Sequence, residues 1–264
     1  MADLAVTAPV PQPTAPLTTL MNTAKPHPRV YKISQSPERI KTKMNLYGKS
    51  GTGKTWMMAD IAKHFRTLMI SSEFSQVTIQ KHNNFALIDP NLEIFDVDSW
   101  DSMREAFDFL LENQAKYEWV LIDSLTDINK RAIEDIASST KDEAMSMRQW
   151  GQVSQRIEKL IRYIRDLRIN VGFSTLATSE KNDMTGEVCM YPSLTGRLKE
   201  EFPAYLDING YVFTKESQTE PGKVDRMIQF VNSPKAIAKD RHNTFANFEF
   251  ADMTTLLRKM KMIT

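Results

Sequence analysis

The sequence predicts an α/β fold in which a mostly parallel sheet is flanked by helices. Short apolar segments alternate with longer amphipathic ones between residues 44 and 175, as they do in the strand–helix–strand units of parallel sheets. A glycine-rich loop links the first apolar segment to a helix-like stretch, and beyond residue 200 short strand-like segments follow one another closely. Closely spaced strands joined by polar turns form hairpins. We therefore expect an antiparallel extension at the C-terminal side of the parallel sheet.

Each element can be justified from its residues. The expected strands of the parallel sheet are MNLY (44–47), TLMIS (67–71), LEIFDV (92–97), EWVLID (118–123) and INVGFST (169–175). The clearest helix spans residues 149–167, because apolar residues recur there every three or four positions. Its stripe, which should cover the sheet, consists of Trp150, Val153, Ile157, Leu160, Ile161, Ile164 and Leu167. The extension is expected from YLDINGYVFTK, RMIQFVN and KAIAKDR, which begin at residues 205, 226 and 235.

Composition favours one folded domain preceded by a tail. With 264 residues, of which 41% are hydrophobic, the chain is long enough to bury a large core. Residues 1–28 contain six of the 12 prolines and are predicted to be a disordered tail rich in Pro, Ala and Thr. Residues 29–264 are then the folded domain. The net charge of +1 neither indicates nor excludes a nucleic-acid partner.

Cysteine usage and hydropathy predict the compartment. Cys189 is the only cysteine of the chain, so no intramolecular disulfide can form. This favours a reducing, cytoplasmic location. No apolar run of the sequence approaches the roughly 20 residues that a membrane span requires, and no membrane partner is expected.

The glycine-rich loop is the strongest motif of the chain. Residues 48–55 match the pattern GxxxxGK[ST] between a predicted strand and a predicted helix, which is the context of a phosphate-binding loop, or P-loop. Its expected nucleotide-binding residues are Gly48, Lys49, Ser50, Gly51, Thr52, Gly53, Lys54 and Thr55. Backbone amides surround phosphate oxygens in such loops, the lysine reaches the terminal phosphates, and the hydroxyl binds Mg²⁺. ATP and Mg²⁺ are the expected cofactors; the alternative is a glycine-rich turn without a ligand.

Polar residues at other strand ends are candidates for the same site. Asp123 ends an apolar strand and is the expected second metal-side group, although an aspartate there can also cap the next segment. Glu73 follows the second strand and is the expected group that activates water, unless it is an ordinary surface residue. Three hydroxyl residues at the end of the fifth strand are candidates to sense the γ-phosphate, with strand-end capping as the alternative. They are Ser174, Thr175 and Thr178.

These residues together resemble the RecA-like ATPase core over about residues 40–250. The segments IDSLTDI, RQWGQVSQRIEKLIRYIRDL and AIAKDR further resemble the phage nucleotide-binding proteins of the Sak type, which are single-strand annealing ATPases. The resemblance implies a role for the KxR pair Lys239 and Arg241, which would act as a finger in the nucleotide site of a neighbouring subunit. A homo-oligomeric ring or filament would then complete each ATP site. A solvated basic strand edge is the alternative reading of the pair.

The resemblance also implies that single-stranded DNA contacts the loops after the fourth and fifth strands, residues 138–150 and 179–199. The candidate DNA-binding residues are Lys141, Arg148, Lys181, Tyr191, Arg197 and Lys199. Basic side chains would contact phosphates, and the tyrosine would offer a stacking surface. Acidic residues are interspersed in both loops, so the DNA assignment depends mainly on the resemblance. The sequence departs from the resemblance at the end of the fifth strand: RecA-like recombinases usually carry a glutamine there and Sak-type proteins often a histidine, whereas FSTLATSE offers only hydroxyls for coupling nucleotide to DNA.

Two functions of different classes follow. The first is an oligomeric, DNA-stimulated ATPase that binds single-stranded DNA in phage recombination or replication, by annealing or in a recombinase-like way, with a single-strand-binding protein as a further expected partner. The second is a nucleotide-switched loader or adaptor that acts through a protein partner with little hydrolysis. A small-molecule kinase is a weaker third option, because no separate arginine-rich lid follows the fourth strand.

Overall fold

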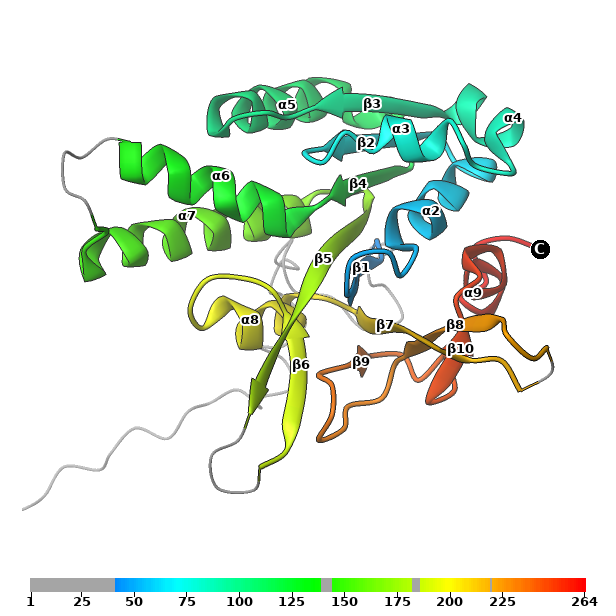
Figure 1. The fold of residues 1–264 in the computed structure, drawn as a ribbon. Helices are drawn as coiled ribbons and strands as arrows, with labels where there is room; N and C mark the ends of the chain where they lie inside the picture. The colour runs from blue at the N-terminus through cyan, green and yellow to red at the C-terminus, as the bar shows by residue number, and fades with distance from the viewer. Residues whose placement is uncertain (1–40, 139–143, 182–185, 219) are drawn as a thin grey trace, which may run out of the picture. The chain divides into compact units, whose positions relative to one another are not determined.

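The computed structural model describes residues 41–138, 144–181, 186–218 and 220–264 of the chain. The predicted tail, residues 1–28, lies outside them. The described residues form one α/β unit around a mixed sheet whose strands run in the order β10-β8-β7-β1-β5-β4-β2-β3, with β6 paired to β5 and β9 to β7 (Figure 1). The predicted fold class, an α/β fold in which a mostly parallel sheet is flanked by helices and extended by antiparallel strands, is confirmed.

The parallel strands begin close to the predicted positions, and all of them except β5 also end close to those positions. They are β1 (Lys43–Gly48), β2 (Thr67–Ser71), β3 (Leu92–Asp96), β4 (Trp119–Asp123), β5 (Asn170–Lys181) and β7 (Ile208–Glu216). The antiparallel partners are β6 (Val188–Pro192), β8 (Val224–Gln229), β9 (Lys239–Asp240) and β10 (Phe248–Phe250). β5 lies between β1 and β4 and pairs with both in parallel.

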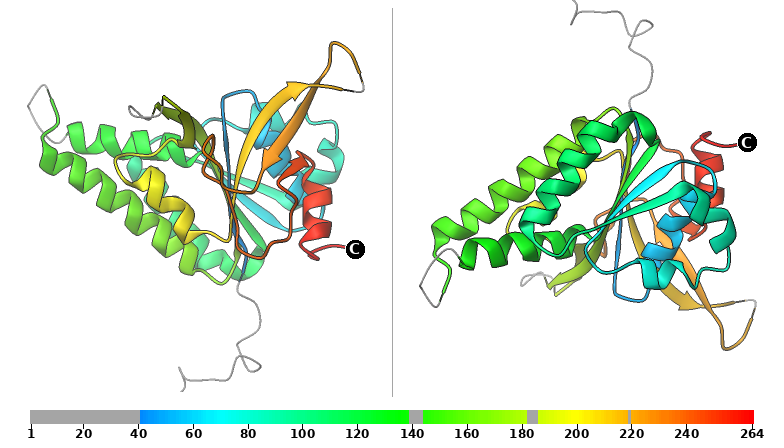
Figure 2. Two further views of the ribbon diagram at one scale, coloured as in Figure 1. Left: turned by 90° about the horizontal axis from the view of Figure 1, so that it is seen from below. Right: turned by 90° about the horizontal axis from the view of Figure 1, so that it is seen from above.

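Helices cover both faces of the sheet. The α-helices are α2 (Lys54–Ala59), α3 (Gln76–Ile79), α4 (Phe85–Ile88), α5 (Trp100–Asn113), α6 (Leu125–Ser138), α7 (Met147–Asp166), α8 (Leu198–Glu201) and α9 (Met253–Lys259). Short 3₁₀ helices are η2 (Asp60–Lys63), η3 (Asp89–Asn91), η4 (Gln114–Lys116) and η5 (Phe202–Tyr205). Figure 2 shows α6 and α7 on one side of the sheet and α9 on the other. No helix among the described residues is long and apolar enough to span a membrane.

The two layers follow from the alternation of side chains along each strand. In β4, Val120 and Ile122 join the core that the sheet shares with α5, α6 and α7. Trp119 and Leu121, which point the other way, join the core that the sheet shares with α2 and α9. Every residue of β4 is buried, so its polar last residue, Asp123, is held inside the protein.

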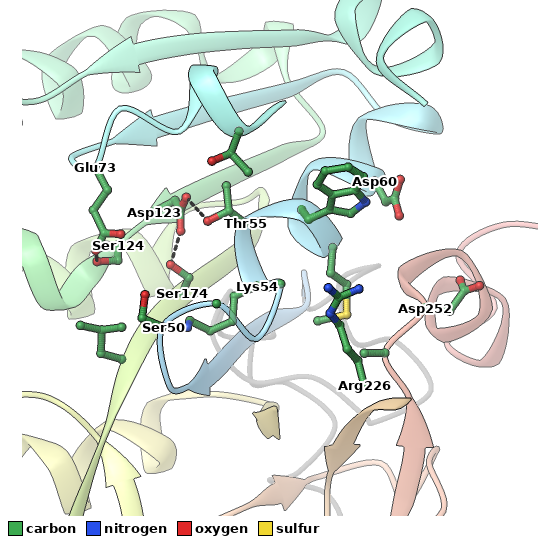
Figure 3. A pocket seen from close by; sticks show the side chains of 17 residues that line it. Ser50, Lys54, Thr55, Asp60, Glu73, Asp123, Ser124, Ser174, Arg226 and Asp252 are labelled. Carbon is green, nitrogen blue, oxygen red and sulfur yellow. Dashed lines mark hydrogen bonds between the residues drawn. The ribbon is translucent and has the colours of Figure 1, made fainter. Parts of the chain in front are cut away.

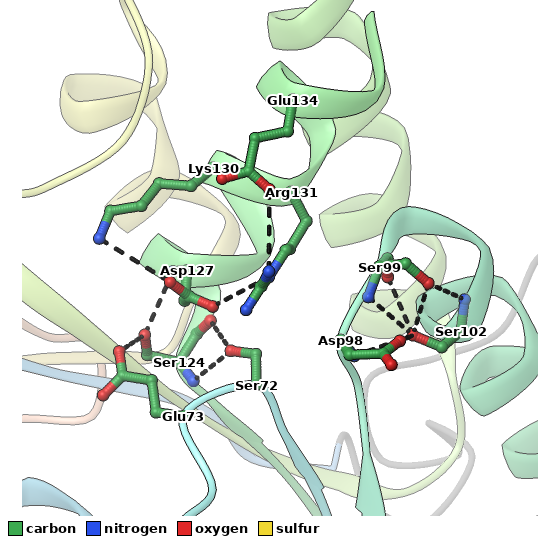
Figure 4. Close-up of polar contacts among 10 residues, drawn as sticks. All are labelled: Ser72, Glu73, Asp98, Ser99, Ser102, Ser124, Asp127, Lys130, Arg131 and Glu134. Carbon is green, nitrogen blue, oxygen red and sulfur yellow. Dashed lines mark hydrogen bonds and ion pairs between the residues drawn. The ribbon is translucent and has the colours of Figure 1, made fainter. Parts of the chain in front are cut away.

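Side-chain caps fix the beginnings of the long helices. Ser99 accepts a hydrogen bond from the backbone N–H of Ser102 at 3.1 Å at the start of α5 (Figure 4), and Ser146 and Gln149 form the same kind of capping box at the start of α7. The helix predicted over residues 149–167 is therefore confirmed. Trp150 is a correction: it is 40% exposed, because it lies on the solvent side of the first turn.

The C-terminal part differs from the predicted extension. The first half of β7 pairs in parallel with β1, from Met44 opposite Ile208 to Gly48 opposite Val212, so it belongs to the parallel sheet. Its second half pairs antiparallel with β8. β5 runs six residues beyond its predicted end because β6 pairs with its outer part. β10 and α9 were not predicted; they place the C-terminal segment beside the P-loop helix layer.

Candidate functional site

The P-loop connects β1 to α2 and is curled around the ammonium group of Lys54. The Nζ atom of Lys54 donates hydrogen bonds to the carbonyls of Gly48 and Lys49, each at 3.0 Å. Gly51 and Gly53 have φ angles of 78° and 88°, in the left-handed region that favours glycine. A Cβ on Gly48 would lie 2.3 Å from the carbonyl oxygen of Val212. The glycines of the motif are therefore required by the shape of this loop.

Burial changes the electrostatics of Lys54. Its side chain is among the buried charged groups, and this burial lowers the pKa of Lys54, while the carboxylates of Asp123 and Glu73 act in the opposite direction. The lysine is thus a desolvated cation beside two carboxylates. A phosphate group placed in this loop would meet an ammonium with little competing hydration.

Asp123 receives hydrogen bonds from three hydroxyl groups that come from different elements. Its Oδ2 atom accepts from Thr55 Oγ1 at 2.8 Å and from Ser75 Oγ at 2.5 Å, and its Oδ1 atom accepts from Ser174 Oγ (Figure 3). The carboxylate is 2% exposed. The end of β4 is thereby tied to the first turn of α2, to the loop after β2 and to β5.

Glu73 lies on the rim beside Asp123. β2 and β4 end together, with Ser71 opposite Asp123, so the loop after β2 passes the buried carboxylate. Ser124 Oγ donates a hydrogen bond to Glu73 Oε1 and accepts one from the backbone N–H of Asp127 at 3.2 Å (Figure 4). Glu73 is otherwise exposed. An exposed carboxylate that is oriented by a neighbour can take a proton from water.

A cavity of about 510 Å³ opens between these groups, which is within the size range of small-molecule sites. Predicted site residues that line it are Ser50, Gly51, Gly53, Lys54, Thr55, Glu73, Asp123 and Ser174. Gly48, Lys49 and Thr52 do not line it. They shape the loop, for example through the hydrogen bond from Thr52 Oγ1 to the Lys49 carbonyl at 2.9 Å.

Thr175 is a correction to the predicted nucleotide-binding residues. It is fully buried and donates to Asn45 Oδ1 at 3.2 Å, and it is not among the residues that line the cavity. Neighbouring residues of a strand point to opposite faces, so only one of Ser174 and Thr175 can face the cavity, and it is Ser174. Thr178 lies farther along β5, opposite Tyr191 of β6.

Sequence reasoning missed several residues around the cavity. Ser75 and Ser124 lie within two residues of Glu73 and Asp123, so their positions beside predicted residues were the available signal. Trp56 and Asp60 follow the P-loop on α2 and η2. Arg226 of β8 and Asp252, which caps α9, come from the C-terminal segment. No motif marks these last two residues.

Lys239 and Arg241 lie away from the P-loop of their own chain. β9 pairs with the beginning of β7, whereas the P-loop follows the far end of β1. Lys239 Nζ donates to the carbonyls of Pro203 and Leu206 at 2.9 and 2.7 Å. Arg241 Nη1 pairs with Asp207 Oδ1 at 2.8 Å. Within one chain, both side chains have structural partners.

The predicted DNA-binding residues do not line the cavity. Lys181 ends β5, and Tyr191 lies opposite Thr178 on β6. Lys199 pairs with Glu180 and lies with its Nζ atom 6.0 Å from the Tyr191 ring centroid. Arg197 occupies the N-cap position of α8 without a side-chain capping hydrogen bond, and Arg148 is exposed in the first turn of α7. Lys141 lies outside the described residues.

The oxygens at the site suit Mg²⁺. The Thr55 hydroxyl and the Asp123 carboxylate are hard oxygen donors, and they lie 2.8 Å apart. The described residues contain no group of three or more His, Cys, Asp or Glu side chains that could hold a metal ion alone. Mg²⁺ is typically bound by one or two protein groups together with substrate phosphates and water. This donor set fits such a shared site.

The chain is similar to a known protein family and to solved structures of other proteins. No curated protein matches the sequence. Flagellar accessory protein FlaH from Methanocaldococcus jannaschii is similar in structure, with a TM-score of 0.43 and 10% identity over 80% of this chain and 87% of that chain. A prototypical ATPase from the type III secretion system of pathogenic bacteria has a TM-score of 0.44 and 11% identity, over 65% of this chain and 52% of that one. The AAA domain family matches residues 40–242, which include the P-loop, Glu73 and Asp123, and the chain belongs to this family.

Proposed function

We propose that the protein is a Mg²⁺-dependent ATPase. The observation that carries the proposal is the hydrogen bond between Thr55 and Asp123, formed beside the buried ammonium of Lys54. Lys54 would bind the terminal phosphates, and Thr55 and Asp123 would hold the metal, which supplies charge neutralisation on the phosphates. Glu73 would orient water and accept its proton.

We further propose that the ATPase binds single-stranded DNA and acts in phage recombination or replication, as an annealing or recombinase-like protein. The path of β5 supports this proposal. Its inner part carries Ser174, which donates to Asp123, and its outer part carries Lys181 in the hairpin with β6. A shift of Asp123 on nucleotide binding would therefore reach the hairpin through one continuous strand.

A homo-oligomer is part of the proposal, with Lys239 and Arg241 acting in the site of a neighbouring subunit. Their position supports an action in trans, because β9 lies at the end of the sheet opposite the P-loop. The side chain of Arg241 is 49% exposed, so its guanidinium can be approached from outside. An arginine that arrives from a neighbour stabilises charge on the transferring phosphoryl group.

Phosphate release from ATP and Mg²⁺, measured with and without single-stranded and duplex oligonucleotides, tests the proposal. We expect release that single strands stimulate and that Lys54→Ala abolishes. Nucleotide binding without release, with or without DNA, would contradict the ATPase proposal and favour a nucleotide-switched adaptor. Phosphate release that neither kind of DNA stimulates would agree with the ATPase proposal but contradict the proposal that the protein acts on single-stranded DNA.

DNA binding itself needs a separate measurement. We expect Lys181→Ala and Tyr191→Ala to weaken single-strand affinity, because one removes a phosphate contact and the other a stacking surface. Lys215→Ala, on the exposed outer part of β7, is the matched control. Affinities measured at two salt concentrations distinguish the two effects, since only the lysine should change the salt dependence.

A further inference from the structure

We propose that Arg226 is a nucleotide-binding residue that contacts the phosphate chain within its own subunit, on the side nearer the nucleoside. The inference rests on the proposed ATP binding and deepens it. It assigns to the C-terminal antiparallel strands a direct part in the site.

The backbone of Arg226 is fixed on two sides. Arg226 lies on β8 opposite Thr214 of β7, and its carbonyl accepts a hydrogen bond from the N–H of Ala251 at 2.9 Å. Ala251 links β10 to α9. The position of Arg226 is therefore set by the sheet and by the C-terminal helix together, and its side chain projects from a rigid element into the cavity.

The guanidinium lies beside the P-loop. A Cβ placed on Gly53 would be 3.2 Å from Arg226 Nε and 3.3 Å from its Cδ. Gly53 directly precedes Lys54 and has a φ of 88°. The missing side chain at Gly53 thus leaves room for the arginine against the loop that is expected to surround phosphates.

Charge points to an anionic ligand. Within the described residues, no ion pair involves Arg226, whereas two nearby cavity carboxylates already have partners. Asp60 pairs with Lys63 at 2.8 Å, and Asp252 accepts the N–H of Thr255 at 2.9 Å as the cap of α9. An arginine with free donors in a polar cavity binds phosphate well, because its planar group can donate two parallel hydrogen bonds.

The direction of the phosphate chain follows from the two ends of the cavity. Figure 3 shows Arg226 and Asp123 on opposite sides of Thr55. The metal-side and water-activating groups, Asp123 and Glu73, mark the end where the terminal phosphate would be. Arg226 is then closest to the phosphates that ATP and ADP have in common.

The test is the affinity of Arg226→Ala and Arg226→Lys for ATP and for ADP, with Arg258→Ala as the control. Arg258 is an exposed arginine on α9 outside this cavity. We expect Arg226→Ala to weaken both affinities about tenfold, as the loss of a charge-assisted contact predicts. Arg226→Lys should lose less, and Arg258→Ala should match the wild type. Thermal unfolding without nucleotide verifies that each variant is folded.

A mixture of subunits tests whether Arg226 acts in its own chain. In an equimolar mixture of Lys54→Ala and Arg226→Ala proteins, each site would still contain one defect, so ATP binding should equal the average of the two proteins. Recovery above that average would overturn the assignment within one subunit.

Unchanged affinities in Arg226→Ala, with binding abolished in Lys54→Ala, would overturn the inference alone. A loss of affinity for ATP but not for ADP would place Arg226 at the terminal phosphate and overturn the proposed direction of the phosphate chain. Failure of the wild-type protein to bind nucleotide would overturn the proposed function as well.

Discussion

The hydroxyl of Thr55 lies 2.8 Å from the carboxylate of Asp123 and donates a hydrogen bond to it. The two residues are 68 positions apart in sequence, and the contact joins the end of the P-loop to the end of β4. Ser174 donates to the other oxygen of the same carboxylate. These hydrogen bonds hold the two proposed metal-side groups together, and a metal ion bound there would replace protein hydroxyl donors on Asp123.

Asp123→Asn should remove the dependence of phosphate release on Mg²⁺. The amide keeps the shape of the carboxylate but lacks its charge, so the metal loses its protein anion and we expect a decrease in kcat of about 100-fold or more. ATP binding measured without metal should change little. The measurement is phosphate release against Mg²⁺ concentration, and Asp101→Asn, on the exposed face of α5, is the control. An unchanged Mg²⁺ response would exclude Asp123 as the metal-side group.

Glu73→Gln should lower kcat and leave nucleotide affinity unchanged. Glutamine can still accept the hydrogen bond from Ser124, but it cannot accept a proton from water. Loss of a positioned general base typically costs about 10²–10⁴-fold in rate. Single-turnover hydrolysis together with an ATP titration separates the two quantities, with the exposed Glu112→Gln as the control. A wild-type rate of single-turnover hydrolysis in Glu73→Gln would mean that Glu73 has no catalytic role.

Arg241→Ala should destabilise the fold whether or not Arg241 also acts in a neighbouring site. Asp207 is 3% exposed and accepts from Arg241 and from the backbone N–H of Lys43, at 2.8 and 2.9 Å. Removing the guanidinium deprives the buried Asp207 carboxylate of its ion pair and leaves it the backbone N–H of Lys43. Because Arg241 is half exposed, we expect a loss of about 1–2 kcal/mol, less than for a fully buried pair.

Denaturant unfolding measures this loss, with Arg66→Ala as the control. The ion pair of Arg66 with Glu118 is exposed and 3.9 Å long, so its loss should cost less than about 0.5 kcal/mol. Equal stability of Arg241→Ala and wild type would contradict the prediction that Arg241 stabilises the fold through Asp207. A test of the trans finger must therefore compare variants at a temperature where Arg241→Ala is still folded, and recovery of activity on mixing with Lys54→Ala subunits would support action in trans.

The sequence predicted the elements with strong local signals and missed those that depend on distant partners. The apolar strands and the periodic helix ending near residue 166 were predictable, because burial on both faces and a 3.6-residue period leave clear patterns. The parallel pairing of Ile208–Val212 with β1 was not predictable, since nothing within that segment specifies its neighbour. The short strand β10 and the seven-residue helix α9 are too brief to show a period.

The same division holds for the site. Lys54, Thr55 and Asp123 follow from a motif and from the position of an aspartate at the end of a buried strand. Whether Ser174 or Thr175 lines the cavity depends on which face of β5 is directed toward it. That orientation is fixed only when β5 pairs with β1 and β4. Arg226 lies beside the P-loop because β8 pairs antiparallel with β7. Nothing in the sequence around Arg226 indicates this position.

Lys43 should make stability depend on pH in the alkaline range. Its side chain is 5% exposed and donates to the carbonyls of Leu167 and Ile169. Burial lowers the pKa of Lys43 from 10.5 to about 8, against the opposing effect of the Asp207 carboxylate. Between these two values the unfolded chain binds a proton that the folded protein has released, so the free energy of unfolding should rise with pH.

The measurement is denaturant unfolding of wild type and Lys43→Met at several pH values from 7 to 11. Tyrosines also titrate near the upper end, so the difference between the two proteins is the quantity to follow. We expect the stability of the wild type relative to the variant to increase on the order of 3 kcal/mol across the window, because one pKa unit corresponds to about 1.4 kcal/mol. A constant difference would mean that Lys43 remains protonated when buried, held by the carbonyls of Leu167 and Ile169 and by the Asp207 carboxylate.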